Sequence, residues 1–347
     1  MKIFFKGYYG FNNLGDDIFV HAALWYCKNF LPGSKPLFVG KNLPTKLYGT
    51  QSKTQLSKNI YELYYSFKCD HVIYWGGSLF EKTSGPTDLK NWIKYCYFFR
   101  KKFSGFGVSI GPFDKFKDKK NITELVDKSN FFGVRDYKSL SYSRKASFSF
   151  DLAILTPFIF DNLKIKKNSI ALEKWVIGVN FCKAENIDSY YNYVNDFCIK
   201  NKNNISKVKI FIFNKHEKVD FDYAYKIFDS LKKSDIEVDI VEYSDNTAQY
   251  IEKINEVNFM FATRLHAAII SYSLNIEFML NEYHDKCTEF INTIQNPYKY
   301  SDNIKNHIMT IDEIKKIKNT KKDPQHFYNI TIKQLENLSS KLKNNEN

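Results

Sequence analysis

Residues 2–31 read KIFFKGYYGFNNLGDDIFVHAALWYCKNFL, and this stretch decides the fold. The apolar run over Lys2–Tyr9 predicts a strand, Gly10–Gly15 a loop, and Asp16–Leu31 a helix. A strand joined through a short loop to an amphipathic helix is the repeating unit of parallel α/β sheets. The apolar residues that share one face of the helix, at helical spacing, are Ile18, Phe19, Ala22, Ala23 and Tyr26.

The same alternation of strand and helix continues along the chain. A length of 347 residues exceeds what one hydrophobic core usually serves. We therefore expect an α/β protein with two Rossmann-like domains facing a cleft, spanning 1–157 and 175–310, with a polar, basic linker at 158–174 and a helical tail at 311–347. Further strands are predicted at 71–75, 105–110, 131–134 and 147–150, and then at 175–181, 208–213, 237–241, 257–262 and 276–280.

The net charge of +13 favours anionic partners. We do not expect nucleic acid, because the lysines are spread along the chain and no zinc-finger, RRM or KH signature occurs. The densest basic stretch is Lys305–Lys322. It is either a solvated helix face and loop or a surface that meets anionic membrane lipid.

The six cysteines indicate a cytoplasmic protein without a metal site. They form no C-x-x-C pair and have no zinc spacing with histidine, which is typical of reduced core thiols. The first residues are too short and polar for a signal peptide, and no apolar run approaches the roughly 18 residues that cross a bilayer.

Two glycine-containing loops are candidate parts of a ligand cleft. In the first, Gly10 and Asn13 precede Asp16 and Asp17, which either cap the helix or serve sugar hydroxyls as hydrogen-bond partners or general base. In the second, Gly76, Gly77 and Ser78 follow the strand at 71–75. Their backbone amides either present N–H groups to an oxyanion or form a structural tight turn.

Arg135 follows the strand at 131–134, which places a guanidinium at the edge of the sheet where ligands bind. Arginine holds a carboxylate or phosphate through two parallel hydrogen bonds. The alternative is an internal ion pair with Asp136 or another acid.

The strongest constellation lies after two successive strands of the second half. Thr-Arg264-Leu-His266 opens a helix after the strand at 257–262, and Tyr283-His-Asp-Lys286 opens another after the strand at 276–280. Carboxyl ends of neighbouring parallel strands share one edge, so His266 and Lys286 should stand on adjacent loops. Helix N-termini add positive potential there, and with Arg135 across the cleft these side chains predict a cationic pocket.

At these residues the chain resembles the polysaccharide pyruvyl transferase family. The matching segments run in order across most of the chain. They are GYYGFNNLGDD at 7–17, WGGSLF at 75–80, GVSIGP at 107–112, GVRD at 133–136, DLA at 151–153, ATRLHAAIISYSLN at 262–275 and YHDKCTEF at 283–290.

The resemblance implies a glycosyltransferase-B-like fold and transfer of a pyruvyl group from phosphoenolpyruvate to a sugar hydroxyl pair. The product would be a pyruvate ketal in capsule or exopolysaccharide biosynthesis. The family's phosphoenolpyruvate-binding cations would be Arg135, His266 and Lys286, and we also expect Arg264 to bind this donor. Protonated His266 would either neutralise the phosphate or act as general acid. No metal or cofactor is expected, because cationic side chains can stabilise the leaving phosphate. The sugar acceptor is expected to be a lipid-linked oligosaccharide met at the inner face of the cell membrane.

Two other functions fit the same fold. One is a nucleotide-sugar glycosyltransferase, which typically places an acidic residue on the donor ribose in the second domain. The other is a non-catalytic protein that binds a glycan precursor. Fold alone does not separate these alternatives.

Overall fold

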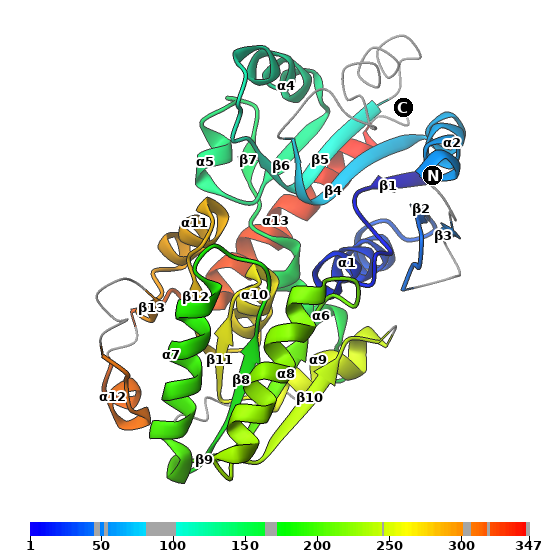
Figure 1. Cartoon of the computed structure of the whole chain (residues 1–347). Helices are drawn as coiled ribbons and strands as arrows, with labels where there is room; N and C mark the ends of the chain where they lie inside the picture. The colour runs from blue at the N-terminus through cyan, green and yellow to red at the C-terminus, as the bar shows by residue number, and fades with distance from the viewer. Residues whose placement is uncertain are drawn as a thin grey trace. The chain divides into compact units, whose positions relative to one another are not determined.

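The computed structural model describes residues 1–44, 49–51, 55–80, 102–163, 172–244, 246–300, 307–317 and 320–344 (Figure 1). The chain divides into two compact units. Unit 1 consists of Met1–Phe11, Asp16–Leu152 and Gln325–Asn347, and unit 2 of Asn12–Gly15 and Ala153–Pro324.

Unit 1 is built on a parallel sheet of seven strands in the order β3-β2-β1-β4-β5-β6-β7. Its first six strands have the 3-2-1-4-5-6 order of a Rossmann fold, so the order reverses between β1 and β4. The strands are β1 (Lys2–Lys6), β2 (Lys35–Gly40), β3 (Gly49–Gln51), β4 (His71–Phe80), β5 (Lys102–Ile110), β6 (Phe131–Val134) and β7 (Ser147–Phe148). The helices are α1 (Leu14–Phe30), α2 (Gln55–Lys68), α4 (Phe116–Lys128), α5 (Tyr137–Leu140) and α13 (Pro324–Lys343).

The C-terminal helix α13 completes unit 1. The Thr331 hydroxyl donates to the Ser149 carbonyl at 2.9 Å, and the rings of Phe327 and Phe150 stack with centroids 4.2 Å apart. The hydroxyls of Tyr26 and Ser339 are 2.9 Å apart and both are buried. The end of the chain therefore packs on the domain that its beginning forms.

The glycine pair Gly76–Gly77 lies inside a strand, which corrects the prediction of a turn directly after residue 75. β4 continues to Phe80, and Gly77 and Ser78 remain paired with Val108 and Ser109 of β5. Both glycines have positive φ, 72° and 84°, a conformation that glycine adopts without strain. A Cβ on Gly76 would stand 2.5 Å from the Phe19 ring, so the helix α1 also requires glycine there.

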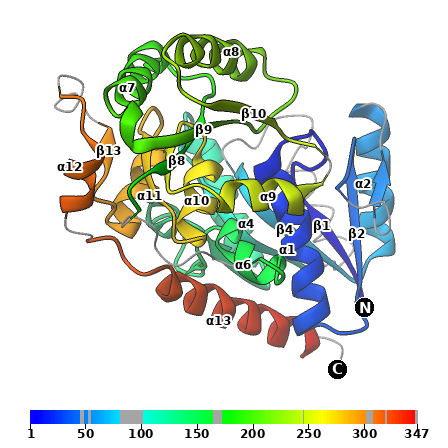
Figure 2. The same ribbon diagram turned by 90° about the horizontal axis from the view of Figure 1, so that it is seen from below.

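Unit 2 repeats the Rossmann order in a parallel sheet of six strands, β10-β9-β8-β11-β12-β13. Helices α7 and α8 cover one face of this sheet and α9 and α10 the other (Figure 2). The strands are β8 (Trp175–Asn180), β9 (Ile205–Ile212), β10 (Val238–Glu242), β11 (Phe259–Ala262), β12 (Glu277–Asn281) and β13 (Lys299–Tyr300). The helices are α6 (Thr156–Ile159), α7 (Ile187–Lys200), α8 (Lys218–Lys233), α9 (Thr247–Asn255), α10 (Leu265–Ser273), α11 (Asp285–Ile294) and α12 (Ile311–Lys316).

The predicted class of two Rossmann-like domains is confirmed, whereas several boundaries move. β1 ends at Lys6 instead of Tyr9, and α1 begins at Leu14 instead of Asp16, so the loop between them lies earlier in the chain than the predicted Gly10–Gly15. β2, β3 and β13 were not predicted, because short runs such as KPLFVG carry too few residues to show a period. The predicted linker at 158–174 begins inside α6, and residues 164–171 lie outside the described part. The cleft between the domains stays a prediction.

Candidate functional site

The strand order of unit 2 reverses between β8 and β11, which lie side by side in the sheet. Ligands of open parallel sheets bind beyond the carboxyl ends of the strands at such a reversal. Here β8 leads to Cys182, and β11 leads to Arg264 at the start of α10. The candidate site is therefore the edge at which these strands end.

Arg264 is held in place by a buried carboxylate. Its Nε and Nη2 donate to the two oxygens of Asp220, in the first turn of α8, at 2.8 and 2.9 Å. Its backbone N–H donates to the side chain of Asn180, the last residue of β8, at 3.0 Å. Burial raises the pKa of Asp220 to about 6, although the positive charge of Arg264 opposes this rise. The Arg264–Asp220 ion pair therefore holds the N-terminus of α10 in place.

His266 packs directly against the glycine loop at the start of the chain. A Cβ built on Gly15 would lie 1.9 Å from His266 Nδ1, closer than any real contact, so only glycine leaves room for this ring position. Asn12–Gly15 belongs to unit 2: Asn13 forms an antiparallel bridge with Asn214, and the Leu14 N–H donates to the Phe213 carbonyl at 3.2 Å. The first loop thus supports the imidazole of the second half.

Lys286 and Tyr283 follow β12, the strand next to β11. The side chain of His284 caps α11 by accepting from the Lys286 N–H at 3.3 Å, which places Lys286 in the first turn. Lys286 is half-buried and forms no ion pair with a carboxylate of the described residues. The Cys182 thiol donates to the Tyr283 hydroxyl at 3.6 Å.

The positive charges of Arg264 and Lys286 both act on the Cys182 thiol. Burial is the largest effect on Cys182 and raises its pKa, and both cations act against that rise. Burial likewise raises the pKa of Cys287 to about 12, again opposed by Lys286. Arg264, Tyr283 and Lys286 therefore all lie near Cys182, whereas the contact shown for His266 is the one with Gly15.

In unit 1, Arg135 is buried and bound on three sides. Its Nη1 donates to Asp151 at 2.9 Å, its Nε to the Ser109 hydroxyl at 2.6 Å and its Nη2 to the Ser78 hydroxyl at 2.8 Å. The internal ion pair considered from the sequence exists, with Asp151 as partner, while Asp136 accepts from Ser109 at 2.7 Å. Three of the five N–H groups of Arg135 are used, which leaves two for a ligand.

Asp16 and Asp17 occupy the first turn of α1, where negative charge is favourable. Asp17 is buried and accepts from the Gly10 N–H at 3.4 Å, so it shapes the loop. Asp16 is half-buried. Gly10 itself has φ of +76° and comes so close to Asn42 that a Cβ would lie 2.8 Å from its backbone nitrogen.

Several residues of the two edges were missed from the sequence. Asp220 stands in the first turn of the helix after β9, a position that the strand–helix pattern could have marked as part of the edge. For Lys58, the strand–helix pattern of the sequence gave no indication of a role at the edge of the sheet. It is buried beside Glu62, 3.7 Å away, and its Nζ lies 5.5 and 5.4 Å from the ring centroids of Tyr8 and Phe11. Burial lowers its pKa.

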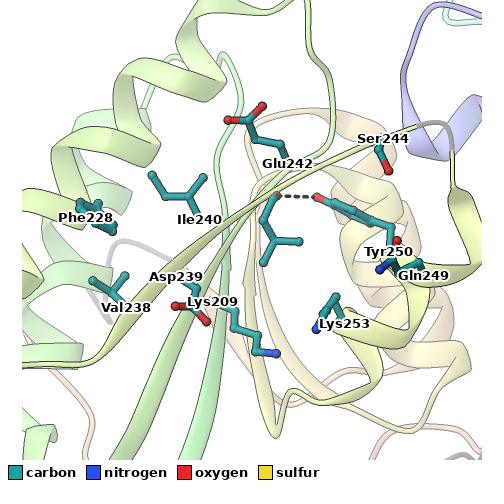
Figure 3. A pocket seen from close by; sticks show the side chains of 11 residues that line it. Lys209, Phe228, Val238, Asp239, Ile240, Glu242, Ser244, Gln249, Tyr250 and Lys253 are labelled. Carbon is teal, nitrogen blue, oxygen red and sulfur yellow. Dashed lines mark hydrogen bonds between the residues drawn. The ribbon is translucent and has the colours of Figure 1, made fainter.

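A separate groove of about 610 Å³ in unit 2 runs along the edge strand β10 (Figure 3). Tyr250 closes one side, and its hydroxyl donates to the carbonyls of Ile212 and Val241 at 2.9 and 3.3 Å. The groove contains none of the residues that the sequence singled out, and its charged lining mixes both signs. The lining residues are Lys209, Phe228, Val238, Asp239, Ile240, Val241, Glu242, Ser244, Gln249, Tyr250 and Lys253.

The described residues contain neither a metal-binding cluster nor a membrane-spanning helix. No three His, Cys, Asp or Glu side chains among them form a cluster able to hold a metal ion. None of the helices in the described ranges is long and apolar enough to span a bilayer. The cysteines in those ranges, all buried and none in a disulfide, are Cys27, Cys69, Cys182, Cys198 and Cys287.

Several solved structures share the arrangement of the chain at low sequence identity. UDP-GlcNAc 2-epimerase from Methanocaldococcus jannaschii aligns with a TM-score of 0.61 and 12% identity, covering 99% of each chain. S. aureus MnaA, in a co-structure with UDP, aligns with a TM-score of 0.59 and 12% identity, covering 97% of this chain and 90% of that one. At such identities the likeness shows the fold alone, which is of the glycosyltransferase-B type.

Comparison with curated proteins found no match. A family model described as polysaccharide pyruvyl transferase matches residues 13–285, a span that runs from the glycine loop to the first residue of α11. Because this match covers well over half of the chain, the protein belongs to the polysaccharide pyruvyl transferase family.

Proposed function

We propose that the protein transfers a pyruvyl group from phosphoenolpyruvate to two hydroxyls of a sugar, forming a pyruvate ketal in a cell-surface polysaccharide. The observation that carries the proposal is the position of His266 and Lys286 at the carboxyl ends of the adjacent strands β11 and β12. A small donor with a carboxylate and a phosphate needs several cations at close range, and this edge supplies them.

The reaction requires a proton on the methylene carbon of phosphoenolpyruvate and two new C–O bonds at its neighbouring carbon. Protonation gives that carbon oxocarbenium character. Two sugar oxygens then attack in turn, the bond to the phosphate oxygen breaks, and inorganic phosphate leaves. Of the two hydroxyl protons, one balances the proton added to carbon and the other leaves with phosphate.

Each cation of unit 2 has a distinct role in the proposal. Lys286 binds the phosphate, because it is half-buried at a helix N-terminus. His266, when protonated, delivers the proton or neutralises the leaving phosphate. Arg264 uses two donor groups on Asp220, so it orients the start of α10 and offers its remaining Nη1 to the ligand.

Unit 1 contributes the remaining proposed groups. Arg135 would bind the donor carboxylate through the two N–H groups that Asp151, Ser78 and Ser109 leave unused. Asp16 is a better candidate than Asp17 for the base that accepts a hydroxyl proton, since Asp17 is buried. In this proposal the cations alone stabilise the leaving phosphate, without metal or cofactor.

Incubation with phosphoenolpyruvate and a panel of lipid-linked oligosaccharides tests the proposal. We expect phosphate release and a glycan whose mass has increased by one pyruvate ketal. A panel that includes nucleotide sugars identifies the acceptor class. Phosphoenolpyruvate binding without phosphate release on any glycan would favour the non-catalytic alternative.

A titration separates the main competing activity, sugar transfer from a nucleotide donor. Structurally similar proteins that were solved with UDP include the S. aureus MnaA above and Anabaena Alr3699/HepE (TM-score 0.50, 9% identity, covering 98% of this chain and 100% of that one). UDP is therefore the appropriate competitor in calorimetry. We expect heat from phosphoenolpyruvate and little from UDP, and the reverse result would overturn the proposal.

A further inference from the structure

Helix α2 of unit 1 presents its apolar residues outward. Ile60, Leu63, Tyr64 and Phe67 follow the i, i+3, i+4, i+7 spacing of one helix face. Their exposed fractions are 59%, 50%, 53% and 44%. A surface helix of an ordinary globular domain buries such a stripe, so this orientation needs an explanation.

The opposite face of α2 explains why the helix cannot simply roll over. Lys58, Glu62 and Ser66 are buried there, at 7%, 6% and 0% exposure. Glu62 forms ion pairs with Lys6 of β1 at 3.0 Å and with Lys58 at 3.7 Å. Turning the apolar stripe inward would break these buried pairs and leave charge without a partner. The outward face is therefore fixed by the polar contacts beneath it.

The charge of the chain is concentrated on the same unit. Unit 1 contains 27 Lys and Arg against 14 Asp and Glu, whereas unit 2 contains 24 of each. The whole net charge of +13 thus belongs to the unit that carries α2. Lys68 ends the helix and is exposed, and so are Lys2 and Lys35, which are register partners on the neighbouring strands β1 and β2. An apolar helix face next to basic side chains is the signature of an interfacial helix.

We propose that unit 1 docks on an anionic lipid bilayer through Ile60, Leu63, Tyr64 and Phe67 of α2, with the positive charge of the unit facing the lipid headgroups. Charge decides between this occupant and a second copy of the chain. Two units of +13 brought together through α2 would repel each other, whereas anionic headgroups attract the same charge. Tyrosine and phenylalanine also suit the boundary between headgroups and acyl chains.

The basic stretch Lys305–Lys322 is less suited than α2 to contact the membrane. That stretch belongs to unit 2, which has no net charge. The side chain of Lys321 within it is buried and paired with Glu277 at 2.9 Å, and Lys315 pairs with Asp312 at 3.8 Å. Two of its lysines are thus paired inside the unit.

The test is sedimentation of the full chain with vesicles of pure phosphatidylcholine and vesicles that also contain phosphatidylglycerol. We expect binding to the anionic vesicles, weakening as salt is raised, and little binding to phosphatidylcholine. Ile60→Ser/Leu63→Ser/Tyr64→Ser should lower the affinity for anionic vesicles by about tenfold or more, because it removes most of the apolar face. Its melting temperature should stay close to that of the unchanged protein, since these side chains are half-exposed.

Phe116→Ser/Tyr225→Ser is the matched control. It removes aromatic side chains that are 81% and 50% exposed on α4 and α8, and it should bind as the unchanged protein does. If the triple variant does not fold, Leu63→Glu replaces it, and the same loss of binding is expected. The proposal is overturned if anionic vesicles do not bind the protein, or if the α2 variants bind as well as the control. It is also overturned if light scattering shows a dimer that only the α2 changes dissociate.

Discussion

The two units differ in where they keep their positive charge. Unit 1 holds the entire net charge, yet its arginine at the sheet edge, Arg135, is tied to Asp151 and two serines. Unit 2 has no net charge, yet His266 and Lys286 share an edge in it. The net charge of a domain therefore indicates whether it is attracted to a large anionic partner. Individual cations at helix N-termini indicate where a small anion binds.

The two arginines sharpen the contrast. Both follow a strand and both pair with a buried aspartate, but Arg264 uses one bidentate partner and Arg135 uses three separate ones. Arg264 therefore retains its Nη1 group as a whole. Arg135 retains one N–H on Nη1 and one on Nη2, and N–H groups on two different nitrogens are what a carboxylate needs to bind through both of its oxygens.

The largest effect is expected from the cations of unit 2. His266→Ala and Lys286→Ala should each lower pyruvyl transfer by about 10²–10³-fold or more, because each removes charge stabilisation of the leaving phosphate. Steady-state phosphate release measures the loss, and melting temperatures should remain near that of the unchanged protein. Lys299→Ala, an exposed lysine of β13, is the control. Near-normal turnover in both variants would show that unit 2 does not contain the phosphoenolpyruvate site.

Gly15→Ala should follow, with a loss of about 10²-fold in turnover. The new Cβ would stand 1.9 Å from His266 Nδ1, so the imidazole must move. Moving a catalytic group by about 1 Å can lower the rate by about 10²-fold. Alanine is otherwise favourable in a helix, so stability should fall little. Gly33→Ala adds a Cβ in open space at φ of +82° and controls for backbone strain. Equal turnover of Gly15→Ala and the native protein would contradict the proposal that the position of the His266 imidazole beside Gly15 matters for catalysis.

Arg135→Lys tests the contribution of unit 1 and should have an intermediate effect. Lysine cannot reach Ser78, Ser109 and Asp151 together, so the melting temperature should fall. The KM for phosphoenolpyruvate should rise about tenfold, as expected when one charge-assisted bond is lost. The exposed Arg144→Lys serves as control. A lower melting temperature with an unchanged KM would mean that Arg135 has only a structural role and that unit 2 alone binds phosphoenolpyruvate.

The smallest effect concerns the pH dependence of stability. Burial holds the pKa of Asp220 at about 6, above its unfolded value, so the folded state binds more protons between about pH 4 and pH 6. This contribution to stability is present below pH 4 and is lost as pH rises through 6. Asp220→Asn should remove that decline from melting curves, whereas Asp222→Asn, on an exposed position, should keep it. Parallel pH profiles for all three proteins would show that Asp220 is not perturbed.

The fold was predictable because its signal is local. Alternation of apolar strands and amphipathic helices identified both sheets, and the residues that follow β6, β11 and β12 were recognised as edge residues. Gly76 and Gly77 show the limit: a glycine pair after an apolar run predicts a turn. The strand continues instead because β5 still offers hydrogen-bond partners.

By itself, the sequence determined the two Rossmann-like units, the excess of positive charge and the order of His266 and Lys286 along adjacent strands. Only the tertiary structure decided that Asp151 and Asp220 neutralise the two arginines, that Gly15 makes room for His266, and that α2 turns its apolar face outward. The physical reason is that periodicity records which face of an element is apolar. Which groups meet depends on packing between segments far apart in the chain.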